Sequence, residues 1–278
     1  MTIDLRATRE THLDIESLLA EHTVILCTYR EQDSGCLSYV VEQDGKRLFV
    51  KAAITPAGAE SMARAAALHA AVHHPALPPL LNAFRAPEGP VHVYDWVPGE
   101  VLYDYVTMDG ERGRNGPASA HARFRTLIVR RILDSLDVIY GLHEQIASLG
   151  FLAVDFYDGC ILYDFDRHRT SVCDIDEYRP GPFVLGADRL PGSRRFMAPE
   201  ESERGATIDQ RANVHTLART AAVLLSDGDL GSDAWRGSDA MRKVLIQAAS
   251  PERDARFPSV AEFVATWDAA AIPFRDAV

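Results

Sequence analysis

The residues best suited to chemistry form two acidic clusters in the second half of the chain. One cluster spans residues 150–164 and the other spans residues 173–177. Two carboxylates on adjacent turns between short strands can hold Mg²⁺ and orient a hydroxyl nucleophile. Because Asp is also common in turns, a plain turn is the simpler interpretation of either cluster taken alone. The clusters therefore indicate a candidate site only together with the segments that position them.

The segments before these clusters are rich in strand formers. Strands are expected at residues 23–29, 37–41, 47–51, 80–84 and 91–96. The Asp-Gly pair at residues 44–45 is a strong hairpin signal between two of them. A helix is expected from Thr55, which can cap it, through Pro56 and an alanine-rich run to about Val72.

Helical patterns dominate the rest of the chain. Apolar residues recur at helical spacing over residues 127–148, and Gly150 marks the end of that helix. Further helices are expected around residues 214–225, 240–249 and 260–270. The polar, glycine-rich stretch 108–120 is expected to be a mobile loop. A β-rich third before an α-rich remainder predicts an α+β fold with a small and a large lobe.

Composition is that of an ordinary globular protein. With 278 residues, 47% of them hydrophobic, the chain can build one large domain or two packed lobes. A net charge of −11 argues against nucleic acid or an anionic membrane as the main partner. The four cysteines show no metal-ligand spacing, and no apolar stretch reaches the roughly 18 residues of a membrane span. We therefore expect a cytoplasmic protein with reduced thiols.

Five segments, in order along the chain, resemble motifs of the protein-kinase superfamily in a divergent form, similar to bacterial eukaryotic-like Ser/Thr kinases. They are His74-Pro-Ala-Leu77, the hinge-like Tyr94-Asp-Trp-Val-Pro-Gly99, the catalytic-loop-like residues 150–164, Gly192-Ser-Arg-Arg-Phe-Met-Ala-Pro-Glu200 and Pro251-Glu-Arg-Asp-Ala-Arg-Phe-Pro-Ser259. The resemblance implies a bilobal fold with an N-terminal extension (1–21), a small lobe (22–97) and a large lobe (98–278). It also implies a buried ion pair between Glu200 and Arg256.

The resemblance assigns roles to individual residues. Lys51 would hold the phosphates of ATP, and Asp155 would accept the proton of the substrate hydroxyl or orient that hydroxyl. Asp174 would bind Mg²⁺ or Mn²⁺ that bridges the phosphates. The backbone of Asp95 and Val97 would form hydrogen bonds to adenine.

The nucleotide-binding segments depart from the family in one loop. Tyr94 would line the back of the pocket, as in the family. Residues 28–35 contain a single glycine, Gly35, where the family usually has three. Fewer bare amides can then approach the phosphates, and Glu31 and Asp33 would repel them. We therefore expect either weak ATP binding or a loop that bends away from the phosphates.

The small-lobe helix lacks the family's glutamate. The expected position falls near Ala65, and Glu60 would lie on a different face of the helix. Glu60 is better explained as an exposed residue of the first turn, where the helix dipole favours it. From the sequence alone, we therefore expect this helix not to supply the family's glutamate to Lys51.

The catalytic loop departs at two positions. Cys160 replaces the Asn that binds a second metal ion, and a thiol is a poor ligand for so hard a cation. Either Asp158 or Asp176 could supply the missing ligand. An acidic residue at position 176 is similar to small-molecule kinases of the choline-kinase type. Tyr157 replaces the loop lysine and offers a hydroxyl without a charge.

Other departures concern regulation and the scaffold. Val154 replaces the Arg that reads an activation-loop phosphate, and residues between Asp174 and Gly192 include no Ser or Thr. We therefore expect no switching by activation-loop phosphorylation. Asn213 stands where the family has a buried Asp, and His143 matches a structural histidine at a helix end.

Two functions stay open at this point. One is an active phosphotransferase that uses ATP and Mg²⁺ or Mn²⁺ on a protein Ser/Thr or a small-molecule hydroxyl. The other is a pseudokinase, a nucleotide-binding or scaffolding module without turnover, which the degraded glycine loop, the missing glutamate and Cys160 favour. The acceptor and the oligomeric state do not follow from the sequence. The amphipathic stretch 12–19 is expected to form a helix packed on the small lobe.

Overall fold

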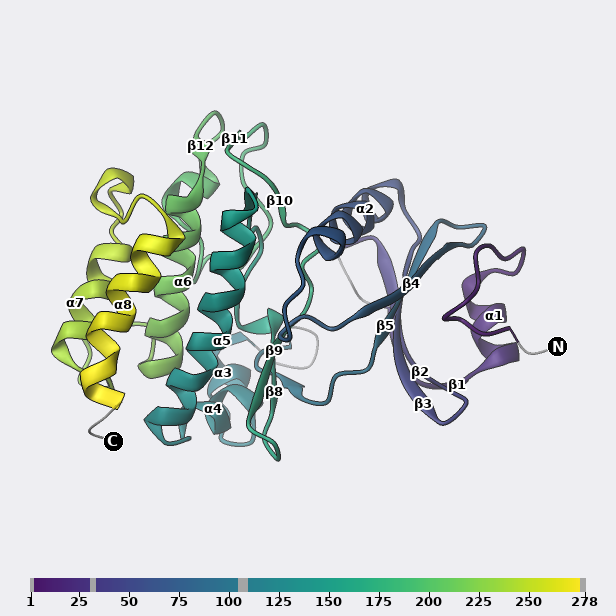
Figure 1. The fold of residues 1–278 in the computed structure, drawn as a ribbon, viewed down its shortest axis with the longest axis horizontal. Helices are drawn as coiled ribbons and strands as arrows, with labels where there is room; N and C mark the ends of the chain where they lie inside the picture. The colour runs from purple at the N-terminus through teal and green to yellow at the C-terminus, as the bar shows by residue number, and fades with distance from the viewer. Residues whose placement is uncertain (1–2, 31–33, 105–109, 276–278) are drawn as a thin grey trace. The chain divides into compact units, whose positions relative to one another are not determined.

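The computed structural model describes residues 3–30, 34–104 and 110–275, and it is a mixed α+β protein with eight α-helices among these residues. The chain divides into two compact units, residues 1–97 and residues 98–278. Figure 1 traces the elements of both units in chain order. Each unit is described by itself below.

The first unit is built on a five-stranded antiparallel sheet with strand order β1-β2-β3-β5-β4. The strands are β1 (Val24–Tyr29), β2 (Cys36–Gln43), β3 (Lys46–Ala53), β4 (Leu80–Arg85) and β5 (Pro90–Asp95). β2 and β3 meet in a hairpin at Asp44 and Gly45, whose φ angles are 52° and 72°. Positive φ at both turn residues is what an Asp-Gly hairpin provides, and the predicted turn is confirmed.

The helix α1 (Ile15–His22) belongs to the core of this unit. Its Leu18 and Leu19 are fully buried and cluster with Tyr39 and Val50 of the sheet. The predicted amphipathic helix is therefore confirmed. The residues that the sequence sets apart as an extension are an integral part of the first unit.

The helix α2 (Pro56–Ala71) lies against β3 and β5. The side chain of Thr55 caps its first turn by accepting a hydrogen bond from the Gly58 N–H at 3.1 Å. Proline occupies the first helical position, where its missing N–H costs nothing. The predicted start of the helix at Thr55 and Pro56 is confirmed.

The second unit begins with two short helices before a long one. α3 (Gly110–Asn115) lies within the stretch 108–120 expected to be a mobile loop, so that expectation is wrong for residues 110–115. α4 (Ala120–Arg125) begins at the last residue of that stretch. Residues 105–109 lie outside the described residues. α5 (Val129–Ser148) follows, and the chain turns after it at Gly150, whose φ is 80°. A glycine in this conformation is a common end of a helix, as the sequence predicted.

Short strands connect the helices of the second unit. They are β6 (Glu100–Val101), β8 (Ile161–Asp164) and β9 (Arg169–Val172) in one sheet, β7 (Phe151–Leu152) paired with β10 (Arg179–Pro180), and β11 (Phe183–Val184) paired with β12 (Thr207–Ile208). The described part of this unit also contains three short 3₁₀ turns, at Asp158–Cys160, Pro199–Ser202 and Arg253–Ala255.

Helices complete the second unit. They are α6 (Gln210–Leu225), α7 (Asp239–Ala248) and α8 (Val260–Arg275), drawn in Figure 1. α6 and α8 pack against α5, and α7 packs against α6 and α8. Tyr140 of α5 is central to this packing. Its hydroxyl donates to the Leu217 carbonyl at 3.2 Å, and its ring meets the buried Trp267 ring edge-on at 5.7 Å.

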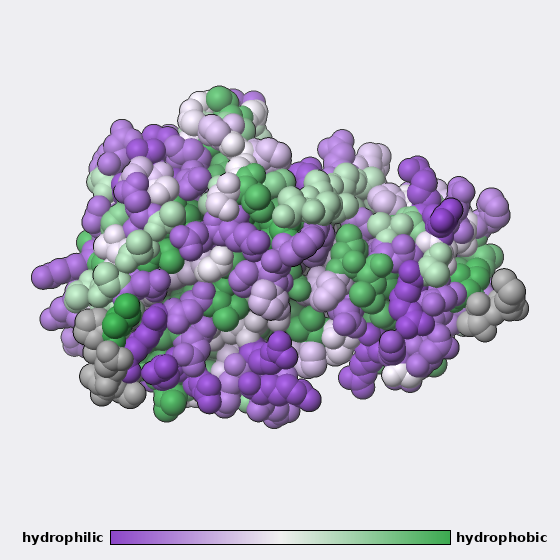
Figure 2. Space-filling model, in the orientation of Figure 1, coloured by the Kyte–Doolittle hydropathy of each residue, from purple (hydrophilic) through white to green (hydrophobic). Residues whose placement is uncertain are grey.

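Hydrophilic residues cover much of the face shown in Figure 2, with apolar residues between them in smaller patches. Among the helices in the described parts of the chain, none combines the length and apolar character needed to cross a membrane.

Candidate functional site

Asp155 and Asp174 share an uncommon backbone conformation. Their φ angles are 65° and 55°, in the left-handed region. Within the described ranges only two other non-glycine residues have positive φ, Asp44 and His168, and both lie in hairpin turns. Asp tolerates this region better than most residues, yet it costs on the order of 1–3 kcal/mol, and such strain gathers at functional sites. Among the described non-glycine residues outside hairpin turns, the left-handed backbone conformation therefore occurs at Asp155 and Asp174, the two aspartates that the sequence singles out.

Cys160 connects these two aspartates. Its Sγ lies 3.2 Å from the Asp155 carbonyl oxygen, to which it donates, and its own carbonyl accepts from the Cys173 N–H at 2.9 Å. Burial raises the pKa of the Cys160 thiol, and the nearby carboxylates of Asp174 and Asp155 raise it further. Both carboxylates therefore lie near one buried thiol, and that thiol serves as a structural link.

Asn213 of α6 holds the backbone just before Asp155. Its Oδ1 accepts from the Ala153 N–H at 2.9 Å, and its Nδ2 donates to the Ala153 carbonyl at 2.7 Å. A carboxylate could only accept, whereas an amide satisfies both backbone groups. The scaffold position that the sequence assigned to Asn213 therefore acts through two hydrogen bonds without a charge.

His143 and Tyr178 form a buried pair between α5 and the segment after Asp174. His143 Nδ1 lies 2.7 Å from the Ile139 carbonyl, which can only accept, so Nδ1 carries the proton. His143 Nε2 then accepts from the Tyr178 hydroxyl at 2.9 Å. The ring also packs 4.4 Å from the Phe156 ring. These contacts give His143 the structural role expected from the sequence.

Asp158 is fully buried and pairs with Arg114 of α3. Arg114 Nε and Nη2 lie 2.6 and 3.0 Å from the two carboxylate oxygens. Burial raises the pKa of Asp158, while Arg114 opposes that rise. The Arg114 guanidinium stacks 3.7 Å over the Tyr103 ring, and His121 Nε2 lies 3.8 Å from Asp158. The contacts of Asp158 are therefore those of a structural ion pair, in place of the predicted role as a metal ligand.

The remaining predicted metal ligands differ in exposure. Asp174 is exposed, whereas Asp176 is buried, with 6% of its surface exposed. Within the described parts of the chain, no group of three or more His, Cys, Asp or Glu side chains could hold a metal ion. Mg²⁺ commonly takes only one or two carboxylates and completes its shell with phosphates and water. Asp174 is thus exposed enough to be one ligand of such a shell, whereas Asp176 is buried.

Glu200 and Arg256 form a buried ion pair across 56 residues of sequence. Arg256 Nη1 and Nη2 lie 2.7 and 3.0 Å from the two carboxylate oxygens. The guanidinium also donates to the carbonyls of Ser250, Arg211 and Pro251. A bidentate pair with these extra bonds satisfies the buried groups on both sides. The ion pair that the sequence motifs implied is confirmed.

The segment before Glu200 reaches the backbone of Asp155. Leu185, Leu190 and Ala198 share a buried cluster with Val154. Gly192 has a φ of 132°, and a Cβ placed on it would lie 3.5 Å from the Asp155 Cα. The segment therefore brings a bare glycine against the residue proposed to meet the acceptor.

Lys51 lies on β3 of the first unit. It is buried, with 6% of its surface exposed, and it pairs in register with His92 of β5. The pKa of His92 is lowered to about 4, mainly by burial and also by His69 and Lys51. His92 is therefore uncharged at neutral pH and adds no positive charge beside Lys51.

The helix facing this sheet carries no carboxylate at the place where the family has one. Ala65 is fully buried, whereas Glu60 is exposed. Because α2 begins at Pro56, Glu60 falls in the second turn and not in the first. Its exposure agrees with the sequence interpretation, and its position in the helix differs from it.

Tyr94 and Asp95 end β5. The Tyr94 hydroxyl lies 3.2 Å from His92 Nδ1, and its ring lies 5.4 Å from the His69 ring. Asp95 is exposed, and its N–H donates to the Pro79 carbonyl at 2.9 Å. Val97 ends the first unit.

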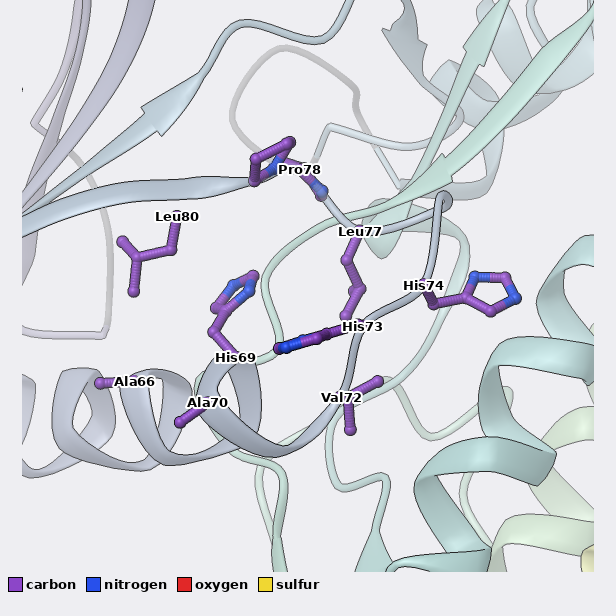
Figure 3. Close-up of a pocket in the computed structure, with 10 residues that line it drawn as sticks. Ala66, His69, Ala70, Val72, His73, His74, Leu77, Pro78 and Leu80 are labelled. Atoms are coloured by element: carbon purple, nitrogen blue, oxygen red, sulfur yellow. The ribbon is translucent and has the colours of Figure 1, made fainter.

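A hollow of about 580 Å³ lies between the end of α2 and the start of β4. Its lining includes His69, His73, Leu77 and Leu80, and Figure 3 shows His74 directed away from the His69 ring. Burial lowers the pKa of His69 to about 4. The hollow is therefore lined by apolar residues and at least one uncharged imidazole.

Gly35 packs against the start of α2. Its φ is 70°, and a Cβ placed on it would lie 2.0 Å from Thr55 Oγ1. Its carbonyl accepts from the Ile54 N–H at 3.0 Å. Close packing alone therefore explains this glycine. Residues 31–33 of the predicted phosphate loop 28–35 lie outside the described residues.

No protein-family model matches the chain, and no curated protein matches it.

Arg114 is the residue near Asp155 that sequence reasoning missed. It lies in a polar, glycine-rich stretch, which conceals its burial. The signal that could have found it is the need of a buried aspartate in the catalytic-loop turn for a cationic partner.

Proposed function

We propose that the chain is an ATP-dependent phosphotransferase of the protein-kinase fold that acts on a hydroxyl acceptor. The observation that carries this proposal is the pair Asp155 and Asp174. Sequence motifs single out both residues, both have a left-handed backbone outside any hairpin, and both lie near the Cys160 thiol. Phosphoryl transfer in protein kinases uses one aspartate that accepts the proton of the acceptor hydroxyl and one that binds the metal ion.

The kinase-like fold assignment draws support from contacts in the second unit. The Glu200–Arg256 ion pair follows from two motifs that are far apart in the sequence. Asn213 holds the backbone two residues before Asp155 from the helix position expected for it. The five-stranded antiparallel sheet of the first unit agrees with a small β-rich lobe.

In the proposed reaction the acceptor oxygen bonds to the γ-phosphorus of ATP. The bond from that phosphorus to the β–γ bridging oxygen breaks, and ADP leaves with the electron pair of this bond. Asp155 accepts the proton of the acceptor hydroxyl and later returns it to solvent. Asp174 holds the divalent cation, with Asp176 as the second candidate ligand. Mg²⁺ or Mn²⁺, when bound, neutralises charge on the phosphates.

The first unit supplies the nucleotide contacts in this proposal. Lys51 binds the phosphates, and His92, which pairs with it in register, is uncharged at neutral pH. The Asp95 N–H already donates to Pro79, so Asp95 offers its carbonyl oxygen to adenine, and Val97 offers its backbone. Tyr94, buried beside His69, closes the back of the adenine site.

A second candidate function is a nucleotide-binding or scaffolding module without turnover. The observations that favour it are the buried Ala65 in place of a glutamate and the Cys160 thiol turned toward the Asp155 carbonyl. The first means that α2 carries Ala65 at the position where the family has its glutamate. The second leaves the second metal position without its amide.

Label transfer from γ-labelled ATP tests the proposal. The wild type, alone and with cell extract, is incubated with Mg²⁺ or Mn²⁺ beside Asp174→Asn and the control Asp166→Asn, which alters an exposed aspartate of the β8–β9 hairpin. We expect label transfer or ADP release by the wild type and the control, and none by Asp174→Asn. Equal signals from all three proteins would remove the proposed role of Asp174. Nucleotide binding without any transfer would favour the second candidate.

A further inference from the structure

A hollow of about 610 Å³ opens on the second unit beside the segment that ends in Glu200. Its lining includes Arg189, Arg194, Met197, Pro199, Ser202 and His215. The hollow is distinct from the aspartates described above, because neither Asp155 nor Asp174 lines it.

The charge of this hollow is positive. Arg189 and Arg194 are exposed, and among the described residues no carboxylate forms an ion pair with either. The one acidic residue of the lining, Asp188, pairs with Arg204 at 2.8 Å. Burial lowers the pKa of His215 to about 4, so this imidazole adds no charge at neutral pH. Two uncompensated guanidinium groups stand out in a chain with a net charge of −11.

Gly192 connects the hollow to Asp155. The Arg189 guanidinium donates to the Gly192 carbonyl and lies 3.3 Å from Met197 Sδ. A Cβ on Gly192 would lie 3.4 Å from the Met197 side chain and 3.5 Å from the Asp155 Cα. Arg189 and the backbone of Asp155 thus both lie against Gly192. Gly192 has no side chain that could stand between a molecule bound at Asp155 and Arg189.

We propose that this hollow binds an anionic group, a carboxylate or a phosphate, carried by the acceptor whose hydroxyl lies at Asp155. This inference rests on the phosphotransferase proposed above and specifies its substrate class. A guanidinium fork matches the paired oxygens of carboxylate and phosphate, and within the described ranges no residue forms a hydrogen bond with the exposed Arg194 side chain. An acidic or phosphorylated peptide and a small phosphorylated alcohol share this chemistry.

Binding of a short peptide that carries a phosphoserine next to its acceptor serine tests the inference without any turnover. Calorimetry compares the full-length wild type with Arg189→Gln, Arg194→Gln and their combination. Arg130→Gln is the matched control, because Arg130 is an exposed arginine of α5 away from the hollow. We expect the double variant to weaken binding about tenfold or more, since hydrogen bonds to charged groups contribute strongly. Arg130→Gln leaves the affinity unchanged.

The conservative variant Arg194→Lys separates charge from geometry. It keeps the positive charge and loses the fork, so its affinity is expected between those of the wild type and Arg194→Gln. Glycerol 3-phosphate forms the second arm. A small acceptor is indicated when it binds as tightly as the peptide, and a peptide acceptor is indicated when the peptide binds more tightly.

Equal affinity of the double variant and the wild type for both probes would overturn the inference. If the affinities are equal but the wild type still transfers label, the anion site is wrong and the proposed phosphotransferase activity is unaffected. If binding depends on the arginines but the wild type transfers no label, the anion site is supported and the phosphotransferase activity is contradicted.

Discussion

Buried polar groups around Asp155 find their partners far away in the sequence. Asn213 satisfies both backbone groups of Ala153, and Arg114 neutralises Asp158. A buried polar group without a partner costs about 1–3 kcal/mol, and a buried charge costs more. These contacts therefore fix the backbone on both sides of Asp155.

Replacement of Asn213 by Ala tests one of these contacts. It leaves the buried N–H and carbonyl of Ala153 unsatisfied, so we expect a loss of about 2–4 kcal/mol in the free energy of unfolding. Urea unfolding followed by tryptophan fluorescence measures this loss. The control is Gln247→Ala, at an exposed position of α7. A loss below 0.5 kcal/mol, the usual range of surface substitutions, would show that the Ala153 contacts contribute little.

Removal of Arg114 leaves a buried carboxylate without its cation. We expect Arg114→Met to lose about 3–5 kcal/mol of unfolding free energy, and Arg114→Met combined with Asp158→Leu to recover most of it. Burial already raises the pKa of Asp158, and the single variant raises it further. A folded pKa above the unfolded one favours the folded state at low pH, so the deficit of the single variant grows as the pH rises. A deficit that is the same at pH 5 and pH 8 contradicts this account.

At the scale of elements, α1 is part of the first unit's core because its apolar residues cluster with those of the sheet. Leu18 is fully buried against the sheet, so Leu18→Ala is expected to cost about 2–5 kcal/mol of unfolding free energy. Glu21→Ala, on the exposed side of the same helix, is expected to change it by less than 0.5 kcal/mol. Hydrogen exchange in β2 and β3 reports the loss directly. Unchanged protection there in Leu18→Ala would mean that the sheet does not depend on α1.

The segment that ends in Glu200 carries a second buried acid, Glu201. Burial raises its pKa from 4.5 to about 7, and its carboxylate accepts from the Ala198 N–H at 2.6 Å. Because the folded pKa is raised, this group's contribution to stability is full below about pH 4.5 and is lost as the pH rises through 7, by about 3 kcal/mol. Glu201→Gln keeps the hydrogen bond and removes the titration.

The stability difference between Glu201→Gln and the wild type therefore grows from pH 4.5 to pH 8, whereas Glu203→Gln, at an exposed position nearby, shows no such trend. Urea unfolding at several pH values measures it. Parallel pH profiles of the wild type and Glu201→Gln would rule out this titration.

At the scale of the whole molecule, local chemistry predicts most elements. The Asp-Gly hairpin, the Thr55-Pro56 helix start and the Gly150 helix end depend on neighbouring residues alone, and the structure has all three. The Glu200–Arg256 pair is non-local, and only the resemblance of two motifs made it predictable.

The elements that sequence analysis missed depend on distant partners. α3 lies in a polar, glycine-rich stretch whose composition favours a loop, but Arg114 is held there by Asp158, 44 residues away. The same pair explains why Asp158 is not available as a metal ligand. Gly35 packs against Thr55, the residue that caps α2. Residues 28–35 alone therefore do not reveal why a glycine is needed at position 35.

The rate of ADP formation from ATP and Mg²⁺ or Mn²⁺ tests the central claim most directly. Asp155→Asn and Asp174→Asn are compared with the wild type and with Asp166→Asn, at equal concentration and after a check that each protein is folded. We expect ADP formation by the wild type and Asp166→Asn, and a rate at least about 100-fold lower in the other two, because each removes a carboxylate that acts on the reacting groups. Rates that do not differ among the four proteins would contradict the proposal that these two aspartates carry out phosphoryl transfer.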